Sequence, residues 1–597
     1  MSESYENSDL YRLRHSAAHI MAQAVLEMFP EAQFAIGPPI RDGFYYDFDL
    51  PRSLVPDDLV AIETRMRETI AAGYPFEYRE ITAAEARKIF ADQPYKLELI
   101  DGLLRGGEDE YGERSAKPVK LSIYRDGEFV DLCRGPHVEN TSQINPDAIK
   151  LMSVAGAYWR GDESKPMLQR IYGTAWETVE ELERYLWRVE EAKRRDHRRI
   201  GRELGLFANH ELIGTGLPLW LPKGATVRRI LEEYIVEEER KTGYQHVYTP
   251  DLAKRELYEV SGHWGHYKDE MFPSIKLEHE EIVLRPMNCP HHILIYASQA
   301  HSYRDLPVRI AELGTMYRYE RSGVASGLSR VRAMTLNDAH IFCRPNQIKE
   351  EFASVMRLVE RAYAALGITD YGFRLSLRDP EDVAKYVAND AMWEMAEQVL
   401  TEVMDDLGLP YTRAPGEAAF YGPKLDIQFR DVLGHEETIS TIQIDFHLPS
   451  QFELSFVGED GQDHRPVIIH RAVISTLERM VAYLIEQYEG AFPVWLAPTQ
   501  AVLIPITDRH VAYARHVAER LFGAGYRVEV DDRSKRMGAK IRDAQLQKVP
   551  YMLVVGDQEI ESESVAVRLR SGEDLGGMCV DDFIARIQTV IEAKTGL

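Results

Sequence analysis

The chain has few cysteines and no long apolar run. Its 597 residues include only Cys133, Cys289, Cys343 and Cys579, which are far apart and form no CxxC pair. This pattern argues against a disulfide framework and predicts a reducing compartment. No stretch approaches the ~18 consecutive apolar residues of a membrane span, and the first twenty residues lack an apolar segment of signal-peptide length. We therefore expect a cytoplasmic protein with no membrane segment.

Basic residues are fewer than acidic ones. The sequence has 96 Asp and Glu against 71 Lys and Arg, a formal net charge of −25. This balance disfavours non-specific binding to nucleic acid, because phosphate contacts require positive surface. Two basic islands, residues 193–202 and 533–548, interrupt the acidic chain. Each alone is equally well explained as a solvated helix face, but two together favour an anionic partner.

The length predicts two to four domains, because one hydrophobic core does not grow to this size. Apolar residues make up 45% of the chain and charged residues 28%, which is ordinary for globular proteins. In residues 1–205, a helical apolar pattern at 16–29 and alternating patterns at 43–50 and 120–133 predict an α+β domain. We expect it to end in one long charged helix from about 175 to 203.

Two further domains follow. Residues 206–491 mix helical patterns such as 226–243 with aromatic and β-branched runs such as 438–448, which predicts a second, large domain. Two prolines in 492–506 precede an apolar run, after which strand and helix signals alternate to the end. This alternation predicts a small α/β domain at 492–597 with a mostly parallel sheet.

Both common nucleotide-binding motifs are missing, GxxxxGK[ST] and GxGxxG after a strand. If the chain binds ATP, another scaffold must hold it. Arg318 and Glu320 lie two apart, on the same face of a predicted strand, and the basic loop 323–332 follows. A guanidinium grips phosphate through two hydrogen bonds, and a carboxylate accepts from an exocyclic amine. Alone, the pair is better explained as a surface ion pair.

Three elements follow one another along the chain. They are a helix and strand ending at 244–250, the Arg-x-Glu strand, and a strand–helix unit with Arg479. This order resembles motifs 1, 2 and 3 of class II aminoacyl-tRNA synthetases, which hold a bent ATP on an antiparallel sheet. From about residue 15 to the C-terminus the chain resembles threonyl-tRNA synthetases. The segments that carry the resemblance are 131-DLCRGPH-137, 285-RPMNCPHH-292, 330-RVRAMTLNDAHIF-342, 418-AAFYGPK-424 and 467-VIIHRAV-473.

The resemblance implies a multidomain α+β and α/β protein. Its expected parts are an α+β editing domain with a linker helix at 1–205, a class II antiparallel-sheet catalytic domain at 206–491 and an α/β anticodon-binding domain at 492–597. Family members usually begin with a further small domain, for which His15 lies too near the start. The implied activity is ligation of threonine to tRNA(Thr) with ATP.

Cys289 precedes two adjacent histidines, His291 and His292, and the residues alone leave it open as a metal ligand, a nucleophile or a buried thiol. The resemblance implies a zinc ion held by Cys289, His340 and His470, with a coordination position left open. A hydrophobic pocket discriminates poorly between threonine and valine. The resemblance implies that zinc does so by taking the amino group and the β-hydroxyl of threonine.

The resemblance also assigns the other active-site residues, with Mg²⁺ expected on the phosphates of ATP. Two positions depart from the family pattern, Met334 where an adenine-stacking phenylalanine is common and Leu336 where glutamine is expected. The implied residues are Met287, Asp338, Tyr421 and Gln443 for threonine, Arg318, Glu320, Arg330 and Arg479 for ATP, and Arg318, Lys424 and His263 for catalysis.

A second cluster lies near the N-terminus. His15 and His19 share one helix face, and Cys133 and His137 form another pair, a spacing that suits zinc; no glutamate is placed for an HExxH protease. Editing domains of alanyl-tRNA synthetases hold metal with such a set, whereas those of threonyl enzymes are thought to use water. Because serine lacks only a methyl, worth ~1–3 kcal/mol, editing is expected. The implied editing residues are His15, His19, Tyr46, Lys96, Asp131, Cys133 and His137.

Partners complete the set of expectations. Glu559 and Arg568 match anticodon readers, beside the basic run 533–548 for the phosphate backbone. The implied partners are tRNA(Thr), ATP, threonine and a second copy of the chain, contacted through motif 1. A non-catalytic tRNA-binding paralogue and a stand-alone hydrolase of charged tRNA are the alternatives. The retained Arg318 and Arg479 of the adenylation site disfavour both.

Overall fold

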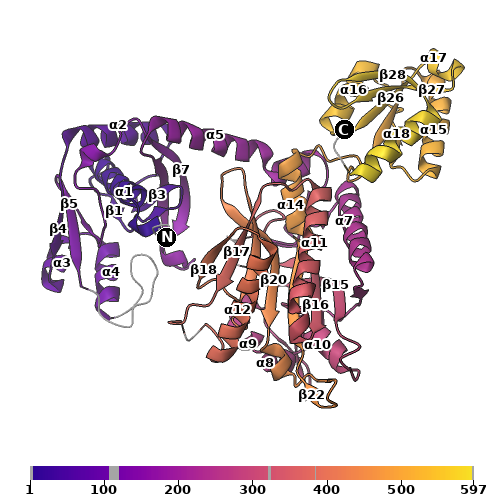
Figure 1. Cartoon of the computed structure of the whole chain (residues 1–597). Coiled ribbons are helices and arrows are strands. Elements are labelled where there is room, and N and C mark those ends of the chain that lie inside the picture. Colours follow the sequence, from indigo (N-terminus) through magenta and orange to yellow (C-terminus); the bar gives the residue numbers. More distant parts are fainter. Residues whose placement is uncertain (1–4, 106–119, 321–324, 383–384, 595–597) are drawn as a thin grey trace. The chain divides into compact units, whose positions relative to one another are not determined.

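The computed structural model describes residues 5–105, 120–320, 325–382 and 385–594, in two compact units, residues 1–190 and 191–597 (Figure 1). The unit boundary falls in helix α5 (Val179–Arg195). The single long helix expected from 175 to 203 is wrong, because α5 ends and a separate helix α6 (His197–Glu203) begins. Asp196 causes the break, since its side chain accepts a hydrogen bond from the Arg198 backbone N–H as the N-cap of α6.

The first unit is the expected α+β fold. Helix α1 (Asp9–Met28) is buried from Leu13 to Val25, and its N-cap Ser8 accepts from the Tyr11 N–H. The strands of a five-stranded sheet are β1 (Gln33–Phe34), β2 (Pro39–Ile40), β3 (Gly43–Asp49), β7 (Ile149–Tyr158) and β8 (Met167–Ala175). A three-stranded sheet contains β4 (Phe76–Glu80), β5 (Ser122–Asp126) and β6 (Phe129–Leu132), and the other helices are α2 (Pro56–Ala72), α3 (Ala83–Ile89) and α4 (Pro94–Arg105).

An eight-stranded sheet organises the second unit. Its order is β11-β15-β16-β23-β20-β19-β17-β18, antiparallel except for the β11–β15 and β17–β18 pairs. The predicted antiparallel catalytic sheet is therefore confirmed. The strands are β11 (Gln245–His246), β15 (Val308–Tyr317), β16 (Ala333–Cys343), β17 (Tyr371–Leu377), β18 (Tyr411–Pro415), β19 (Lys424–Arg430), β20 (Glu436–Asp445) and β23 (Val467–Thr476).

Side-chain alternation gives this sheet two different faces. Ala339, Ile341 and Ile469 belong to the main hydrophobic core, which also contains side chains from the covering helices. The residues between them on β16 and β23 therefore point to the opposite face. The covering helices are α7 (Pro222–Lys241), α11 (Ile348–Leu366) and α14 (Leu477–Tyr488), seen beside the sheet in Figure 1.

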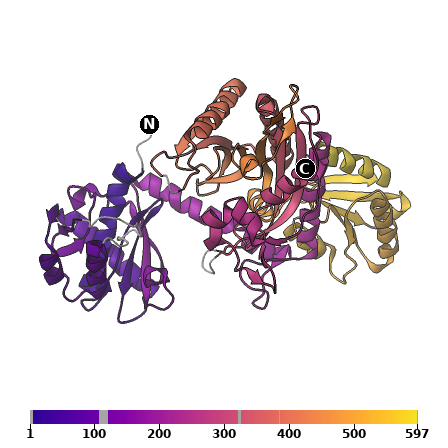
Figure 2. The ribbon, with the colours of Figure 1, turned by 90° about the horizontal axis from the view of Figure 1, so that it is seen from below.

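The C-terminal sheet has the order β25-β24-β26-β27-β28. The prediction of a mostly parallel sheet is confirmed for only half of the strand pairs. Strand β24 pairs in parallel with β25 and β26, whereas the β26–β27 and β27–β28 pairs are antiparallel. Helices cover both faces (Figure 2). The elements are β24 (Ala501–Pro505), α15 (Val511–Gly523), β25 (Val528–Val530), α16 (Met537–Leu546), β26 (Tyr551–Val555), α17 (Asp557–Glu561), β27 (Ser564–Leu569), β28 (Asp574–Cys579) and α18 (Val580–Ala593).

The remaining strands and α-helices lie between these elements. Among the helices of the described chain, none combines the length and apolar character that crossing a membrane requires. The remaining strands are β9 (Phe207–Ala208), β10 (Leu219–Trp220), β12 (Leu252–Lys254), β13 (Ile275–Lys276), β14 (Glu281–Leu284), β21 (Phe456–Val457) and β22 (Asp463–His464). The remaining α-helices are α8 (Arg255–Val260), α9 (His263–Tyr267), α10 (Cys289–Ala297), α12 (Asp390–Leu407) and α13 (Leu448–Gln451).

Candidate active site and editing site

One register row of the eight-stranded sheet carries four of the predicted site residues. Lys424 pairs with Gln443, Gln443 with His470, and His470 with His340, across strands β19, β20, β23 and β16. Residues opposite each other in a sheet present their side chains on the same face. The row thus brings together side chains that lie far apart in the sequence.

The predicted zinc ligands meet at this row. The ligand atoms of Cys289, His340 and His470 lie within 4.8 Å of one another, and all three side chains are buried. Cys289 begins helix α10. Nε2 of His340 and Nδ1 of His470 are buried without a hydrogen-bond partner. One thiol and two unpartnered imidazole nitrogens at this separation fit the donor set of a zinc ion.

The second nitrogen of His470 supports this interpretation. Its Nε2 lies 2.9 Å from Oδ2 of Asp445, whose Oδ1 accepts backbone N–H groups of His447 and Leu448. A carboxylate that accepts from Nε2–H leaves the lone pair of the neutral ring on Nδ1, which faces the cluster. Burial, followed by Asp338 and Asp445, raises the pKa of the Cys289 thiol well above its usual value. A cation held by these residues would supply the charge that offsets this cost and favours the thiolate.

A cavity of about 280 Å³ opens from this cluster. Tyr421 donates a hydrogen bond of 2.6 Å to Oε1 of Gln443 in its wall. The structure thus gathers the residues predicted for threonine beside the metal ligands, with two of the predicted arginines in the same cavity. The predicted residues that line it are Met287, Cys289, Arg318, Asp338, Tyr421, Gln443, His470 and Arg479.

The predicted ATP residues converge, although not on one strand. Strand β15 ends at Tyr317, so Arg318 and Glu320 lie in the segment after it, which corrects the expectation of a shared strand face. Nε of Arg330 lies 2.9 Å from Oε2 of Glu320. Residues 323 and 324 of the expected basic loop lie outside the described residues. Burial lowers the pKa of Arg479, Glu437 opposes this, and the nearby Arg318 and Arg330 lower it further. Such a concentration of guanidinium groups suits an anion.

Lys424 and His263 border the cavity without lining it. Nζ of Lys424 lies 2.9 Å from Oδ2 of Asp426, a fully buried carboxylate that also accepts from Ser376 Oγ at 2.8 Å. No sequence pattern singled out Asp426. His263 begins α9, its Nδ1 lies 2.8 Å from Ser261 Oγ, and burial, then His470, lowers its pKa to about 3.

The two departures from the family pattern lie in the same cavity. Met334 and Leu336 line it and contact Met287, Met316 and Val331 in a small apolar cluster. The part of the cavity next to Met334 is therefore bounded by flexible thioethers, where the family pattern has an aromatic ring.

The seven predicted editing residues form a separate cluster in the first unit. His15 and His19 project from α1, and the ligand atoms of both, of Cys133 and of His137 lie within 4.8 Å of one another. Sγ of Cys133 is 3.3 Å from Nε2 of His15 and 3.3 Å from Nε2 of His137. A cavity of about 20 Å³ reaches this cluster past Ile36, Gly37 and Pro38.

Hydrogen bonds fix which imidazole nitrogens carry protons. Nδ1 of His15 lies 3.2 Å from the Pro136 carbonyl oxygen, so it donates. Nδ1 of His137 lies 3.1 Å from Ser16 Oγ, whose own proton goes to Arg12 O at 2.8 Å, so it donates as well. The Nε2 lone pairs of both rings therefore face Cys133. The Cys133 thiol can donate to one of these lone pairs, which leaves the other for a water donor or a metal ion.

Lys96, Asp131 and Tyr46 form a buried, hydrogen-bonded group next to this cluster. Lys96 and Asp131 are both buried, with Nζ and Oδ1 2.5 Å apart, and Tyr46 OH donates to Oδ2 of Asp131 at 2.5 Å. Nε2 of His19 lies 3.5 Å from Oδ2 of the same carboxylate. Burial, then the charge of Lys96, lowers the pKa of His19 to about 3; burial, then His19, does the same for His15. The rings are neutral at physiological pH.

The predicted anticodon readers lie on two consecutive elements of the C-terminal domain, Glu559 on α17 and Arg568 on β27. Oε2 of Glu559 accepts from the Gly556 N–H at 2.8 Å and caps α17. Arg568 on β27 pairs with Asp574 at 2.7 Å. In the basic run, Lys540 is buried, and its Nζ donates to the carbonyl oxygens of Pro505 and Asp531. Lys540 is thus a structural lysine rather than part of a phosphate-binding surface.

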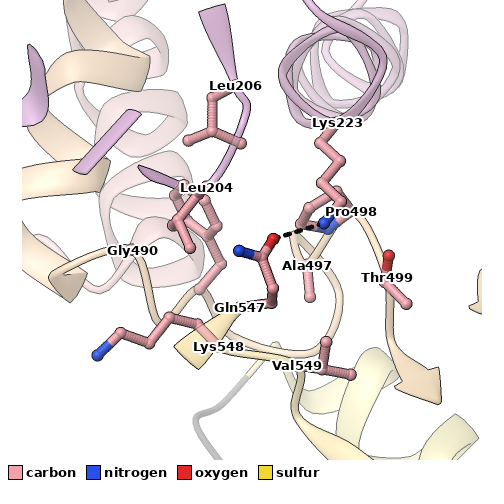
Figure 3. A pocket seen from close by; sticks show the side chains of 11 residues that line it. Leu204, Leu206, Lys223, Gly490, Ala497, Pro498, Thr499, Gln547, Lys548 and Val549 are labelled. Atoms are coloured by element: carbon pink, nitrogen blue, oxygen red, sulfur yellow. Dashed lines mark hydrogen bonds between the residues drawn. The ribbon is translucent and has the colours of Figure 1, made fainter. Parts of the chain in front are cut away.

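A smaller cavity of the second unit is not a substrate site. It is lined by Leu204, Leu206 and residues 547–549, and Lys223 donates across it to Oε1 of Gln547 at 2.7 Å (Figure 3). Its volume of about 10 Å³ admits about one water molecule. The Gln547 side chain in it is already engaged, by Lys223 and by the Glu203 carbonyl oxygen.

Comparison with known proteins agrees with this geometry. The tRNA synthetase class II core domain (G, H, P, S and T) matches residues 271–488, an anticodon binding domain matches 500–590, and the threonyl and alanyl tRNA synthetase second additional domain matches 121–172. With the antiparallel sheet and the arginine-lined cavity, these matches define a class II aminoacyl-tRNA synthetase.

Curated relatives specify the family. Threonine–tRNA ligase of Halalkalibacterium halodurans is 54% identical over 580 residues, 96% of this chain and 88% of that protein. Threonine–tRNA ligase 1 of Bacillus subtilis is 53% identical over 585 residues, 98% and 88%. A crystal structure described as the RNA binding domain of threonyl-tRNA synthetase from Cryptosporidium parvum Iowa II, 36% identical, covers 66% of this chain and 98% of its own with a TM-score of 0.63. The chain belongs to the threonine–tRNA ligases.

The neutral histidines of the first unit predict how stability depends on pH. The pKa of His15 and His19 is about 3 in the folded chain, against 6.5 in the unfolded chain, so the unfolded chain binds more protons between these values. The contribution of the two histidines to the free energy of unfolding is complete above pH 6.5. It is lost as the pH falls, by up to about 1.4 kcal/mol per histidine and pH unit. Between pH 7 and pH 5 the urea concentration at the unfolding midpoint should therefore fall less in the variant with His15→Gln and His19→Gln than in the parent.

The exposed His279→Gln is the matched control and should keep the parent's dependence on pH. Circular dichroism in metal-free buffer gives the midpoints. An equal loss in the parent and the double variant would contradict the neutral, buried state of these rings.

Proposed function

We propose that the cavity beside Cys289 and His470 binds threonine and ATP together, and that the chain joins them to threonyl-adenylate and pyrophosphate before transfer to tRNA(Thr). The observation that carries the proposal is the continuity of this cavity. One end holds the metal-ligand cluster and the residues for threonine, and the other end holds Arg318 and Arg479. An amino-acid carboxylate and an α-phosphate fit between them.

Positioning and charge neutralisation account for the activation step. Arg318 contacts the α-phosphate and the attacking carboxylate, Arg330 the outer phosphates, and Arg479 the adenine ring. Glu320, which pairs with Arg330 in this structure, exchanges that partner for the adenine amino group. Lys424, held by Asp426, lies near the carboxylate. Mg²⁺ accompanies the phosphates of ATP, whose oxygens suit a hard cation.

Cys289, His340 and His470 would hold zinc, and Asp338 accepts from the hydroxyl of threonine. Zinc bound there would supply coordination positions for the amino group and the β-hydroxyl of threonine, and valine would leave one of them unfilled. Tyr421 and Gln443, joined by their 2.6 Å hydrogen bond, bound the amino-acid end, where Met287 also lies. His263, close to Tyr421 with ring centroids 6.4 Å apart, assists transfer to the terminal adenosine of the tRNA.

The test of this function combines metal content with substrate choice. The purified parent should hold about one tightly bound zinc per chain and show ATP–pyrophosphate exchange with threonine and serine but not valine. Cys289→Ser should lose the zinc. It should also reduce exchange by more than about 100-fold, because removing a residue that only hydrogen-bonds a metal ligand already costs up to that factor. Cys343→Ser, at a buried thiol outside the cluster, is the control and should keep both. Full threonine exchange in a zinc-free protein would contradict the selector role.

We further assign hydrolysis of seryl-tRNA(Thr) to the cluster of the first unit. The neutral His15, His19 and His137 rings carry lone pairs that accept a proton from a held water, whose oxygen attacks the ester carbonyl while the tRNA ribose oxygen leaves with that proton. Lys96, Asp131 and Tyr46 fix the opposite wall. A pocket there that binds the serine hydroxyl would exclude threonine by its extra methyl group, because a clash is easier to enforce than an absence.

The editing prediction separates ligation from hydrolysis. The variant with His15→Ala and His19→Ala should charge threonine near normally and accumulate seryl-tRNA(Thr), measured with labelled serine and tRNA. His279→Ala, on the surface of the second unit, is the control and should accumulate none. Unchanged hydrolysis of seryl-tRNA in the double variant would overturn the assignment. Zinc near two per chain in the parent would show that this cluster also takes a metal.

The C-terminal α/β fold supports an anticodon-reading role for Glu559 and Arg568. Replacing the exposed Lys535 and Arg536 with alanine should flatten the salt dependence of tRNA binding, by about 1 in slope for each phosphate that is no longer neutralised. Glu559→Ala should leave that slope unchanged and weaken discrimination among anticodons, whereas Glu561→Ala on the same helix should change neither. Identical effects of the two kinds of variant would contradict the division between backbone and base readers.

Three further proposals concern the domain limits, the cellular location and the oligomeric state. The domain limits are 1–205, 206–491 and 492–597, and the working location is the cytoplasm. A homodimer forms through α7 and β11, next to which Tyr248 is 96% exposed in the single chain. Analytical ultracentrifugation at micromolar concentration tests the dimer, and a Tyr248→Asp variant should shift it toward the monomer.

A further inference from the structure

His292 stands beside the predicted metal ligands and has a defined set of partners. It lies three residues after Cys289 on α10 and is fully buried. Its Nδ1 is 2.8 Å from Nδ1 of His340, and its Nε2 is 3.1 Å from Oε2 of Glu312. Both of its nitrogens are thus engaged, one by a metal ligand and the other by a carboxylate.

The direction of these hydrogen bonds follows from Glu312. Its carboxylate accepts from the Thr249 N–H at 3.0 Å and from Thr249 Oγ1 at 2.8 Å, and lies 3.4 Å from Arg285. Burial raises the pKa of Glu312, but its hydrogen bonds from His292 and Thr249 outweigh this and hold it at about 2. Glu312 is therefore ionised and can only accept.

The tautomer of His340 follows in turn. Nε2 of His292 donates to Glu312, so in the neutral ring its Nδ1 accepts. The proton between His292 and His340 then belongs to Nδ1 of His340. This leaves the lone pair of His340 on Nε2, the buried nitrogen that has no hydrogen-bond partner and belongs to the metal-ligand cluster.

We propose that His292 is a positioning residue of the zinc site, which with Glu312 holds the His340 imidazole in the tautomer and orientation that metal binding requires. The inference rests on the proposed zinc site. It gives one of the two adjacent histidines a role outside the ligand set. The other, His291, is also buried, but neither of its ring nitrogens has a hydrogen-bond partner among the described residues.

Three substitutions remove different parts of this arrangement. His292→Phe keeps a ring and removes both nitrogens. His292→Asn places an amide oxygen near the position of Nδ1 and keeps the acceptor for His340. His292→Gln places its amide near the position of Nε2 and keeps the donor to Glu312. His291→Phe is the matched control on the same helix.

The measurement is the affinity of the full chain for Zn²⁺, from competition with a chelator, together with the visible absorption of the Co²⁺-loaded protein, which reports coordination geometry. His292→Phe should bind zinc about 10- to 100-fold more weakly than the parent. His292→Asn should lie closest to the parent and His292→Gln should be weaker than Asn. The cobalt spectrum should change in the same order, and His291→Phe should match the parent in both measurements.

Either of two results would overturn the inference: zinc affinity and cobalt spectrum unchanged in all three His292 variants, or Gln at least as good as Asn. If the Phe variant does not fold, the Asn–Gln comparison decides alone. A parent protein that binds no zinc would instead refute the proposed function, so the two failures are distinguishable.

Discussion

The antiparallel register of strands β19, β20, β23 and β16 is the constraint on which the rest of the active site depends. A shift of one residue in any of these strands would turn its site residue from the cavity face to the core face. The core face gives the register its stability, because Ile341, Ile469, Ile442 and Leu425 are fully buried there. The packing that stabilises the sheet thus also places Lys424, Gln443, His470 and His340 in one row.

Buried polar groups then fix the side chains that the register has placed. Asp445 orients His470, Asp426 holds Lys424, and Glu239 on α7 pairs with the fully buried Arg471 beside His470 at 2.7 Å. Each of these carboxylates would cost several kcal/mol to bury alone and is stable only with its partners in place. The site residues consequently have little freedom to reorient when substrate arrives, as electrostatic preorganisation requires.

The sequence predicted much of this and failed at identifiable places. Helix α1 and the strands β5 and β6 follow directly from apolar periodicity, and the grouping of Cys289, His340 and His470 agrees with the ligand set that the family resemblance implies. Sequence adjacency alone would make His291 and His292 the partners of Cys289, because adjacency in the sequence is visible and adjacency across a sheet is not. Asp426 and Glu312 carry no signal at all, since a buried carboxylate is recognisable only from its partners. The break at Asp196 was readable as an N-cap and was missed within a charge-rich helical pattern.

Zinc X-ray absorption of the full chain, with and without threonine, tests the central claim most directly. The claim is that Cys289, His340 and His470 form a three-ligand metal centre that recognises threonine through its remaining positions. It predicts one sulfur and two imidazole nitrogens around zinc, an increase in nitrogen and oxygen neighbours when threonine is added, and a smaller increase with valine. A spectrum with no sulfur neighbour, or one that threonine leaves unchanged, would contradict it.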